Sequence, residues 1–329
     1  VILSSCILLI STIIFNFYLN KETIILLLIF QIVQLVRTTD IYSYTFYIFK
    51  KGNDFGIIQI INSLKLLILI FICILNDLNL FNLSLLLILN YALDNITIFY
   101  FFKRNNLFYL ISKFKFNFVK FKYYLKFGLP LVFSNLFLFA SSKLDIIFIK
   151  SILDDYSAGI YAAPSKIVFQ SIQFLILIPL NLVPLLPSNF LEINNKSMDK
   201  FYKKTWIISL IFTVLFFLSG GMIIDILFGP EFADSKKIIY IVGITIFFNG
   251  IMVSDNAFLN YYGFRDIILL KSLSALLINI VLNLTLIPLY GIIGASLSLL
   301  ISSVVVSYGG LIFNNKLNNH YKKLFFPFY

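Results

Sequence analysis

The stretch WIISLIFTVLFFLSGGMIIDIL, residues 206–227, decides the fold class of this chain. Its one ionisable residue, Asp225, lies near its end, and nearly all the others are apolar. About 20 such residues in a helix, each rising 1.5 Å, cross the ~30 Å hydrocarbon core of a bilayer. This stretch therefore predicts a membrane-spanning helix.

The composition of the whole chain agrees with that prediction. Hydrophobic residues make up 60% of its 329 residues, and charged residues make up only 12%. A soluble domain of this size could not cover its surface with so little polar material. We therefore predict an all-α integral membrane protein.

Apolar runs separated by polar turns predict about ten transmembrane helices. They cover residues 1–19, 23–36, 56–75, 81–102, 127–149, 159–188, 206–227, 238–258, 272–289 and 292–313. Most of these runs are long enough to cross the bilayer as helices. The second run is short, and residues 37–49 either complete its span or lie along the membrane interface.

A basic stretch, residues 103–126, divides the predicted spans into four before it and six after it. It contains seven Lys and Arg residues and no acidic residue, which places it in the cytoplasm. Its aromatic rings alternate with lysines, a pattern suited to the surface of an anionic leaflet. The predicted organisation is a partial N-terminal lobe (1–102), this cytoplasmic linker, a C-terminal lobe (127–313) and a cytoplasmic tail (314–329).

The sequence gives no sign of nucleic-acid binding, metal binding or a cofactor. The net charge of +11 comes from lysines spread over loops, and no soluble domain is predicted that would present them to nucleic acid. Cys6 and Cys73 lie inside apolar runs, as small hydrophobic residues do. The single histidine, His320, lies in the polar tail, where we expect it to be solvated.

Three segments resemble one known family. They are YLKFGLPLVFSNLFLFASSKLDIIFIKSILDDYSAGIYAAPSKI (124–167), FGPEF (228–232) and IPLYGIIGASLS (287–298). In order and spacing they resemble the second lobe of the polysaccharide repeat-unit (O-antigen and capsule) flippases. These flippases belong to the multidrug/oligosaccharidyl-lipid/polysaccharide exporter superfamily. The resemblance covers residues 124–313, whereas the first hundred residues agree only in helix spacing.

The resemblance implies a fold, a function and partners. It implies two six-helix lobes around a central cavity that opens alternately to each side of a bacterial inner membrane. The implied activity is not enzymatic: the protein would flip undecaprenyl-pyrophosphate-linked oligosaccharides to the periplasmic leaflet. Membrane lipids, a polysaccharide polymerase and chain-length machinery are the further implied partners. Since only four spans precede the linker, we expect two more helices, roughly 60 to 80 residues, before Val1.

Ionisable residues inside predicted spans are the candidates for a transport site. They are Lys65, Asp94, Lys143, Asp145 and Lys166. A charge at the bilayer centre costs about 2.5 to 3.5 kcal/mol on insertion scales, so each must be paired, reach the interface or face a wet cavity. Lys65 and Asp94 lie at equal depth on consecutive spans and can form a pair. Asp145 and Lys166 also lie at similar depth, whereas Lys143 lies ~200° around its helix from Asp145.

Each candidate has a structural and a functional interpretation. Charged pairs can hold neighbouring helices together, or the lysines can attract the pyrophosphate and acidic sugars of the cargo. Asparagines inside spans can bind sugar hydroxyls or bond between helices; they are Asn90, Asn95, Asn135, Asn249 and Asn256. Pro179, in the proline-rich sixth span, is either a hinge or a static kink. Asp255 lies near the cytoplasmic end of its span, where it can reach the interface, and is not a candidate.

Two other functions compete with the flippase. A cation-coupled multidrug antiporter of the same superfamily would need a carboxylate-lined cation site in the first lobe, where Asp94 is the acid well inside the bilayer. A membrane glycosyltransferase or polysaccharide polymerase would use Asp154 and Asp155 in an outer loop. The predicted outer loops, roughly a dozen residues long, are short for such enzymes, and no catalytic constellation accompanies the two acids.

Overall fold

The computed structural model describes residues 52–75, 80–107, 117–176, 178–179, 183, 186, 196–313 and 317–327. Every element within these ranges is a helix. The chain divides into two compact units, Val1–Phe116 and Asn117–Tyr329, and the boundary falls inside the predicted basic linker. The first two predicted spans lie outside the described residues.

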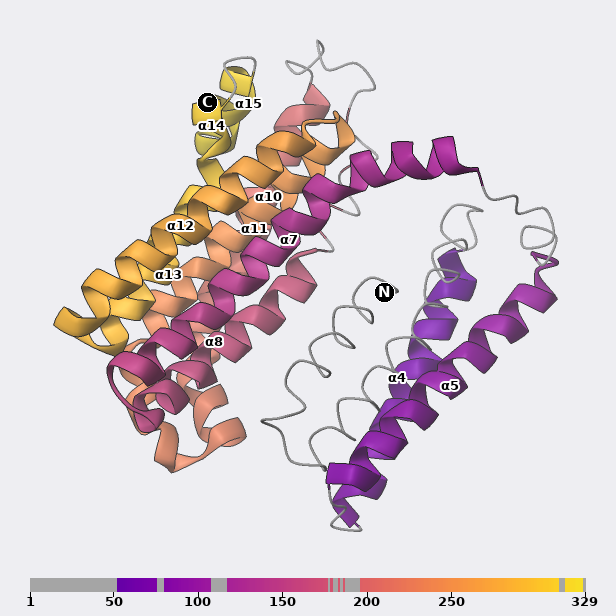
Figure 1. Cartoon of the computed structure of the whole chain (residues 1–329), viewed down its shortest axis with the longest axis horizontal. Coiled ribbons are helices and arrows are strands. Elements are labelled where there is room, and N and C mark those ends of the chain that lie inside the picture. Colours follow the sequence, from indigo (N-terminus) through magenta and orange to yellow (C-terminus); the bar gives the residue numbers. More distant parts are fainter. Residues whose placement is uncertain are drawn as a thin grey trace. The chain divides into compact units, whose positions relative to one another are not determined.

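The described part of the first unit is an antiparallel pair of helices, α4 (Gly52–Leu75) and α5 (Leu80–Arg104) (Figure 1). Three polar contacts join the two helices, between Lys65 and Asp94, Asn62 and Thr97, and Asp54 and Asn105. From one contact to the next, the α4 residue number falls by as much as the α5 number rises. The pair therefore keeps one antiparallel register over residues 54–65 and 94–105.

The second unit is a bundle of long helices with short ones at its ends. The long helices are α7 (Phe118–Ile152), α8 (Asp155–Leu175), α10 (Lys196–Phe228), α11 (Ile239–Tyr261), α12 (Arg265–Tyr290) and α13 (Ile292–Tyr308). The 3₁₀ helix η4 (Pro230–Lys237) joins α10 to α11, and α14 (Gly310–Phe313) and α15 (Asn318–Phe325) follow α13. Figure 1 shows the long helices running side by side, with α14 and α15 at one end.

Six of the described helices are long and apolar enough to cross a membrane, namely α4, α5, α7, α10, α11 and α12. Their outer faces carry large apolar side chains such as Leu218, which is 80% exposed, and Leu289, which is 72% exposed. Such surfaces are suited to lipid and not to water. The chain is therefore a multi-pass membrane protein, as the sequence predicts, while the count of ten helices in two lobes stays a prediction.

Polar side chains lie inside the second unit, where they join its helices. Ser134 of α7 shares a 2.7 Å hydrogen bond with Ser272 of α12, and the Ser307 hydroxyl of α13 donates to the Phe248 carbonyl of α11 at 2.7 Å. Many buried hydroxyls also bond within their own helix, as Ser209 does to the Thr205 carbonyl. Small residues and interhelical hydrogen bonds are the usual means of packing helices in lipid, where water does not drive association.

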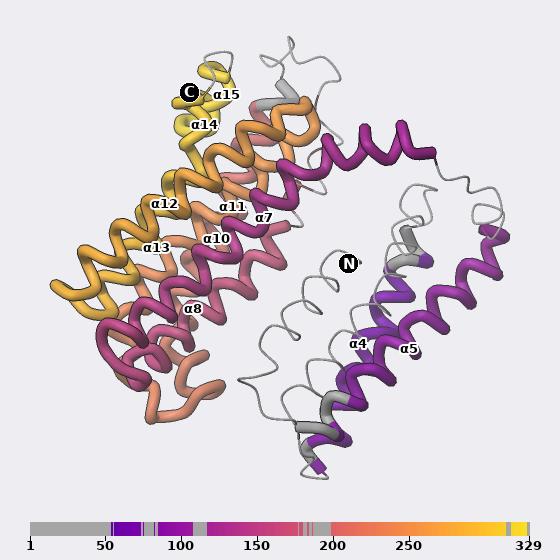
Figure 2. Tube along the Cα trace, in the orientation of Figure 1, coloured from indigo at the N-terminus to yellow at the C-terminus, as the bar shows by residue number. Residues whose placement is uncertain are grey.

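Two element boundaries differ from the sequence prediction. Helix α7 begins at Phe118, because the Asn117 side chain caps it by accepting a hydrogen bond from the Lys120 amide at 3.1 Å. The end of the predicted linker is therefore helical, and Figure 2 shows this first part of α7 bending away from the bundle. The helix contains Pro130, which removes one of its backbone hydrogen bonds. Helix α8 ends at Leu175, so Pro179 lies beyond it and not inside one continuous sixth span.

Candidate functional site

Lys143 and Lys166 are exposed side chains on two neighbouring helices, each more than two turns from the nearest helix end. Lys143 lies nine residues before the end of α7 at Ile152, and Lys166 lies eleven residues after the start of α8 at Asp155. These intervals are about 14 and 17 Å along the helices, close to half the thickness of a hydrocarbon core. Both lysines are therefore at a depth where a charge facing lipid is costly.

The two lysines lie on a common face formed by α7 and α8. The Nζ atom of Lys143 lies 5.7 Å from the ring centre of Phe139 on its own helix and 5.8 Å from that of Phe169 on α8. Phe169 follows Lys166 by three residues, which places both on one side of α8. Aromatic rings stabilise a cation through their electron-rich faces, and so they hold the Lys143 ammonium at this face.

Uncharged polar side chains continue this face along both helices. Gln170 and Gln173 follow Lys166 at helical spacing, and the three lie within an arc of about 60° at 100° per residue. All three are exposed, as is Asn135 two turns before Lys143 on α7. We call Asn135, Lys143, Lys166, Gln170 and Gln173 the α7–α8 polar face. It explains why α8, although 21 residues long, is not among the helices apolar enough to span a membrane.

The polar face has the chemistry to bind an anion that carries hydroxyl groups. No hydrogen bond or ion pair joins Lys143 or Lys166 to another residue that the structure describes, so their ammonium groups have no carboxylate partner there. The amides of Asn135, Gln170 and Gln173 provide donors and acceptors beside them. A phosphate near the lysines and sugar hydroxyls near the amides would match these groups.

Asp145, the third predicted residue of this region, faces the inside of the bundle and not the polar face. It is buried, and its carboxylate accepts hydrogen bonds from Asn279 at 2.9 Å and Asn283 at 2.6 Å on α12 and from the Tyr161 hydroxyl of α8 at 2.9 Å. The ion pair with Lys166, one of the predicted alternatives, is not formed. Asp145 therefore joins three helices, which agrees with the interpretation that this residue holds neighbouring helices together.

Lys65 and Asp94 form the predicted ion pair. Their Nζ and Oδ1 atoms lie 2.7 Å apart, and both side chains are mostly buried between α4 and α5. A pair at this depth neutralises two charges that would each be costly in lipid. The contact agrees with the structural interpretation and does not test a role in binding cargo.

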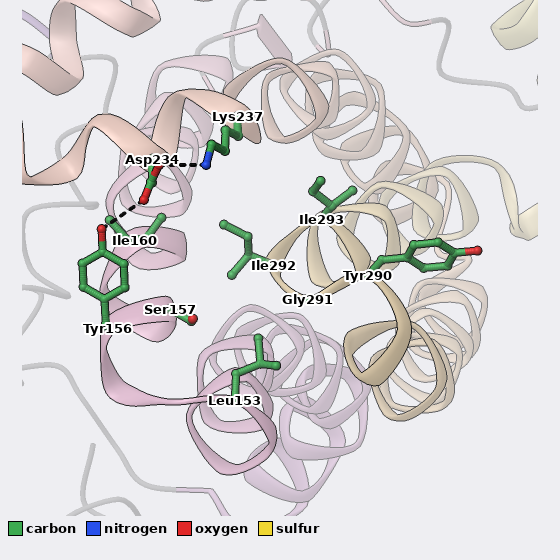
Figure 3. A pocket seen from close by; sticks show the side chains of 10 residues that line it. All are labelled: Leu153, Tyr156, Ser157, Ile160, Asp234, Lys237, Tyr290, Gly291, Ile292 and Ile293. Atoms are coloured by element: carbon green, nitrogen blue, oxygen red, sulfur yellow. Dashed lines mark hydrogen bonds and ion pairs between the residues drawn. The ribbon is translucent and has the colours of Figure 1, made fainter.

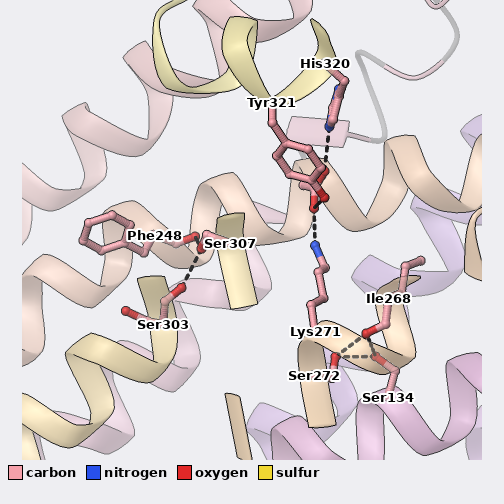
Figure 4. A network of polar contacts seen from close by, with 10 residues as sticks. Ser134, Phe248, Ile268, Lys271, Ser272, Ser303, Ser307, His320 and Tyr321 are labelled. Atoms are coloured by element: carbon pink, nitrogen blue, oxygen red, sulfur yellow. Dashed lines mark hydrogen bonds and ion pairs between the residues drawn. The ribbon is translucent and has the colours of Figure 1, made fainter. Parts of the chain in front are cut away.

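Three residues at one end of the second unit contradict their sequence predictions. Asp255, expected to reach the interface, is fully buried and pairs with Lys271, which lies in the second turn of α12 and was predicted to lie in a loop. His320, expected to be solvated, is also fully buried and lies 2.7 Å from Asp255. Figure 4 shows Lys271, His320 and Tyr321 converging on this cluster. His320 and Asp255 are buried and not solvated because α15 packs onto the bundle.

A pocket of about 310 Å³ opens at the opposite end of the second unit. The α7–α8 turn, η4 and the α12–α13 turn line it, as Figure 3 shows. At its rim Asp234 accepts a hydrogen bond from Tyr156 at 3.1 Å and pairs with Lys237 at 2.9 Å. The hydrogen bond from Lys237 holds the pKa of the Asp234 carboxyl below its usual value. These groups satisfy one another, so the pocket presents no free charge to a ligand.

The other candidates lie in several environments. Among the asparagines, Asn135 is exposed on the polar face, Asn90 is buried, and Asn95, Asn249 and Asn256 are half-buried. Pro179 is buried beyond the end of α8, and its role as a hinge stays a prediction. Sequence reasoning missed Gln170 and Gln173, although their spacing of four and seven residues from Lys166 is a readable helical signal.

Comparisons with known proteins add no identification. No family model, curated protein or solved structure matches this chain.

Proposed function

We propose that this protein is a transporter that flips undecaprenyl-pyrophosphate-linked oligosaccharides from the cytoplasmic to the periplasmic leaflet of a bacterial inner membrane. The α7–α8 polar face carries the proposal. Two lysines with no carboxylate partner among the described residues lie about 14 and 17 Å along α7 and α8 from the α7–α8 turn, beside exposed apolar side chains. Such charges belong in a wet cavity and not in lipid, and a wet cavity halfway through a membrane is the working part of a transporter.

The chemistry of the face indicates the class of cargo. Two ammonium groups attract the pyrophosphate, for which a compact point charge is sufficient. The amides of Gln170 and Gln173 extend from Lys166 toward the other end of α8 and are placed to bond sugar hydroxyls. Transport then requires the face to open alternately to the two sides of the membrane.

The architecture that we propose has two lobes, and the polar face lines the transport cavity. The second unit contributes six long helices, α7, α8 and α10 to α13, which is the number that one lobe of this superfamily contains. The first lobe includes α4 and α5. The rival drug antiporter needs a free carboxylate in that lobe, whereas Asp94 is neutralised by Lys65, which argues against a cation site at Asp94.

The experiment that tests the proposal measures flipping in the native host. Depletion of the protein should cause lipid-linked oligosaccharide to accumulate on the cytoplasmic leaflet, where a lectin detects it in inside-out vesicles. Lys143→Ala and Lys166→Ala should reproduce this accumulation while the protein level in the membrane stays normal. A lost charged contact of 1.5 to 3 kcal/mol corresponds to a loss of transport of about tenfold to a hundredfold. Lys166→Arg should retain part of the activity because the charge remains.

Lys150→Ala is the matched control. Lys150 is also an exposed lysine of α7, but it lies at the end of the helix and pairs with Asp155 at 2.8 Å, so its loss should leave transport unchanged. Depletion without accumulation of lipid-linked sugar would reject the proposed cargo. Normal flipping by the Lys143→Ala/Lys166→Ala double variant would reject the polar face as its site. Drug sensitivity on depletion, with normal lipid-linked sugar, would favour the antiporter.

A further inference from the structure

The short helix α15 is docked on the end of the second unit by its buried face. His320, Tyr321 and Leu324 are buried, whereas Asn318, Asn319 and Lys322 are exposed. Trp206 of α10 donates a 2.7 Å hydrogen bond to the Leu324 carbonyl. Nearby, Lys323 pairs with Asp199 of α10 at 2.7 Å. An eight-residue helix is too short to be stable alone, so these contacts hold it in place.

His320 occupies the centre of the docked face and uses both ring nitrogens. Its Nδ1 atom lies 2.7 Å from the Tyr202 hydroxyl of α10, and its Nε2 atom lies 2.7 Å from Oδ1 of Asp255 on α11. A carboxylate only accepts, so we assign the proton to Nε2, which leaves Nδ1 to accept from Tyr202. The ring also stacks on Phe258, with 3.8 Å between ring centres. Neutral imidazole therefore satisfies every hydrogen-bonding group of this contact.

The burial of the cluster disfavours a second proton on His320. Lys271 of α12 already pairs with Asp255, and both side chains are fully buried. The other titratable groups around the ring are Tyr202 and Asp199 of α10, Tyr262 of α11, Tyr308 of α13, and Tyr321 and Lys323 of α15 itself. Burial lowers the pKa of His320 below its usual value, and it outweighs the hydrogen bond and the charge of Asp255, which act in the opposite direction.

The glycine at residue 310 makes room for the docked helix. Gly310 begins α14, between α13 and α15. A Cβ atom on Gly310 would overlap the hydroxyl of Tyr321 and lie 2.5 Å from its Cζ. Tyr321 in turn donates a hydrogen bond to Asp255 at 3.3 Å. The docked position of α15 therefore depends on the absence of a side chain at residue 310.

We infer that α15 is a pH-responsive latch: with neutral His320 inserted between Tyr202 and Asp255 it holds the ends of α10 and α11 together, and protonation of His320 releases it. The inference does not depend on the transport proposal. These helix ends carry the lysines that place them on the cytoplasmic side, so the latch would respond to cytoplasmic pH. Histidine is the side chain whose charge changes in this range.

The direction of the response follows from proton linkage. Because the pKa of His320 is lower in the docked state than in the released state, docking is fully present above the released pKa of about 6.5. It weakens as the pH falls below that value. Between pH 7.5 and 5.5 the docking equilibrium constant should fall by up to about tenfold.

Hydrogen–deuterium exchange of the full chain in detergent or nanodiscs tests the latch. The measured quantity is the protection factor of a peptide covering residues 317–327, corrected for the intrinsic pH dependence of exchange. We expect a decrease of up to about tenfold from pH 7.5 to 5.5. The helix η4, which contains no histidine, is the internal control and should show no such decrease. Equal protection at both pH values would overturn the inference.

Two variants separate the histidine from the rest of the contact. His320→Gln retains an N–H donor for Asp255 but does not titrate, so protection of α15 should become independent of pH. If it still fell at pH 5.5, another group would be responsible and the inference would be wrong.

Gly310→Ala should lower protection at both pH values through its overlap with Tyr321. Gly221→Ala is its control because a Cβ atom there meets nothing within 4 Å; unchanged protection in Gly310→Ala would overturn the docking geometry.

Discussion

Asn279 and Asn283, one turn apart on α12, both donate their side-chain N–H groups to the same oxygen of Asp145, at 2.9 and 2.6 Å. The other carboxylate oxygen accepts from the Tyr161 hydroxyl of α8. One buried carboxylate thus satisfies donors from two neighbouring helices. In a membrane this is a strong structural constraint, because donors deprived of their acceptor find no water to replace it.

Replacement of Asp145 by Ala should therefore destabilise the second unit. It leaves three donors unpaired, and a buried unsatisfied group costs about 1 to 3 kcal/mol. Asp145→Asn should be tolerated, because its carbonyl oxygen still accepts from Asn279 and Asn283 and the Tyr161 hydroxyl can rotate to accept from its amide. Thermal unfolding in detergent measures both variants. If Asp145→Asn unfolds like the wild type but loses transport, Asp145 has a role beyond joining helices.

Lys65 and Asp94 should tolerate exchange but not separation. Asp94→Ala leaves Lys65 as an uncompensated charge, which costs about 2.5 to 3.5 kcal/mol at the bilayer centre, and lowers the protein level in the membrane. The exchanged variant Lys65→Asp/Asp94→Lys should recover most of that level because the 2.7 Å pair re-forms. Quantitative blotting of membrane fractions gives the readout. A double variant as poorly accumulated as Asp94→Ala would mean that these positions do more than pair.

The helices and the contact between Lys65 and Asp94 could be predicted from the sequence for clear physical reasons. Long apolar runs predict helices because few other structures satisfy the backbone in lipid. Lys65 and Asp94 could be paired from the sequence because equal depth on two antiparallel spans is enough for contact. The same reasoning failed for Lys166 and Asp145, because depth says nothing about direction. Lys166 lies about 140° around α8 from Tyr161, the residue that contacts Asp145.

The buried cluster of Asp255, Lys271 and His320 could not be predicted from the local sequence pattern. The sequence predicts Lys271 in a loop. In the structure α12 begins six residues earlier, at Arg265, so Lys271 is helical and lies inside the bundle. His320 reads as solvated because its neighbours Asn318, Asn319, Lys322 and Lys323 are polar. Its burial depends on α15 packing across α10, a contact between segments more than a hundred residues apart.

Membrane topology is the next prediction, and it follows from the distribution of lysines. Reporter fusions after Asn105 and Asn195 should report a cytoplasmic location. Fusions after Asp154 and Asp234 should report a periplasmic one. A periplasmic Asn105 would reverse the orientation of the spans before it, and a periplasmic Asn195 would place the α15 latch on the periplasmic side.

A close approach between α10 and α11 gives a prediction that needs no assumption about function. Gly250 of α11 packs against Ser209 of α10: a Cβ atom at residue 250 would overlap the Ser209 hydroxyl and lie 2.8 Å from the Ser209 Cβ. Gly250→Ala should therefore force the two helices apart, at a cost of about 1 to 3 kcal/mol. Gly221→Ala, on α10 with nothing within 4 Å, should unfold like the wild type.

Ser209→Gly removes the obstructing atoms at a cost of about 1 kcal/mol for glycine in a helix. The double variant Gly250→Ala/Ser209→Gly should accordingly be more stable in thermal unfolding than Gly250→Ala alone. If Ser209→Gly lowered the stability of Gly250→Ala further, the clash between residues 209 and 250 would not be the cause of the destabilisation.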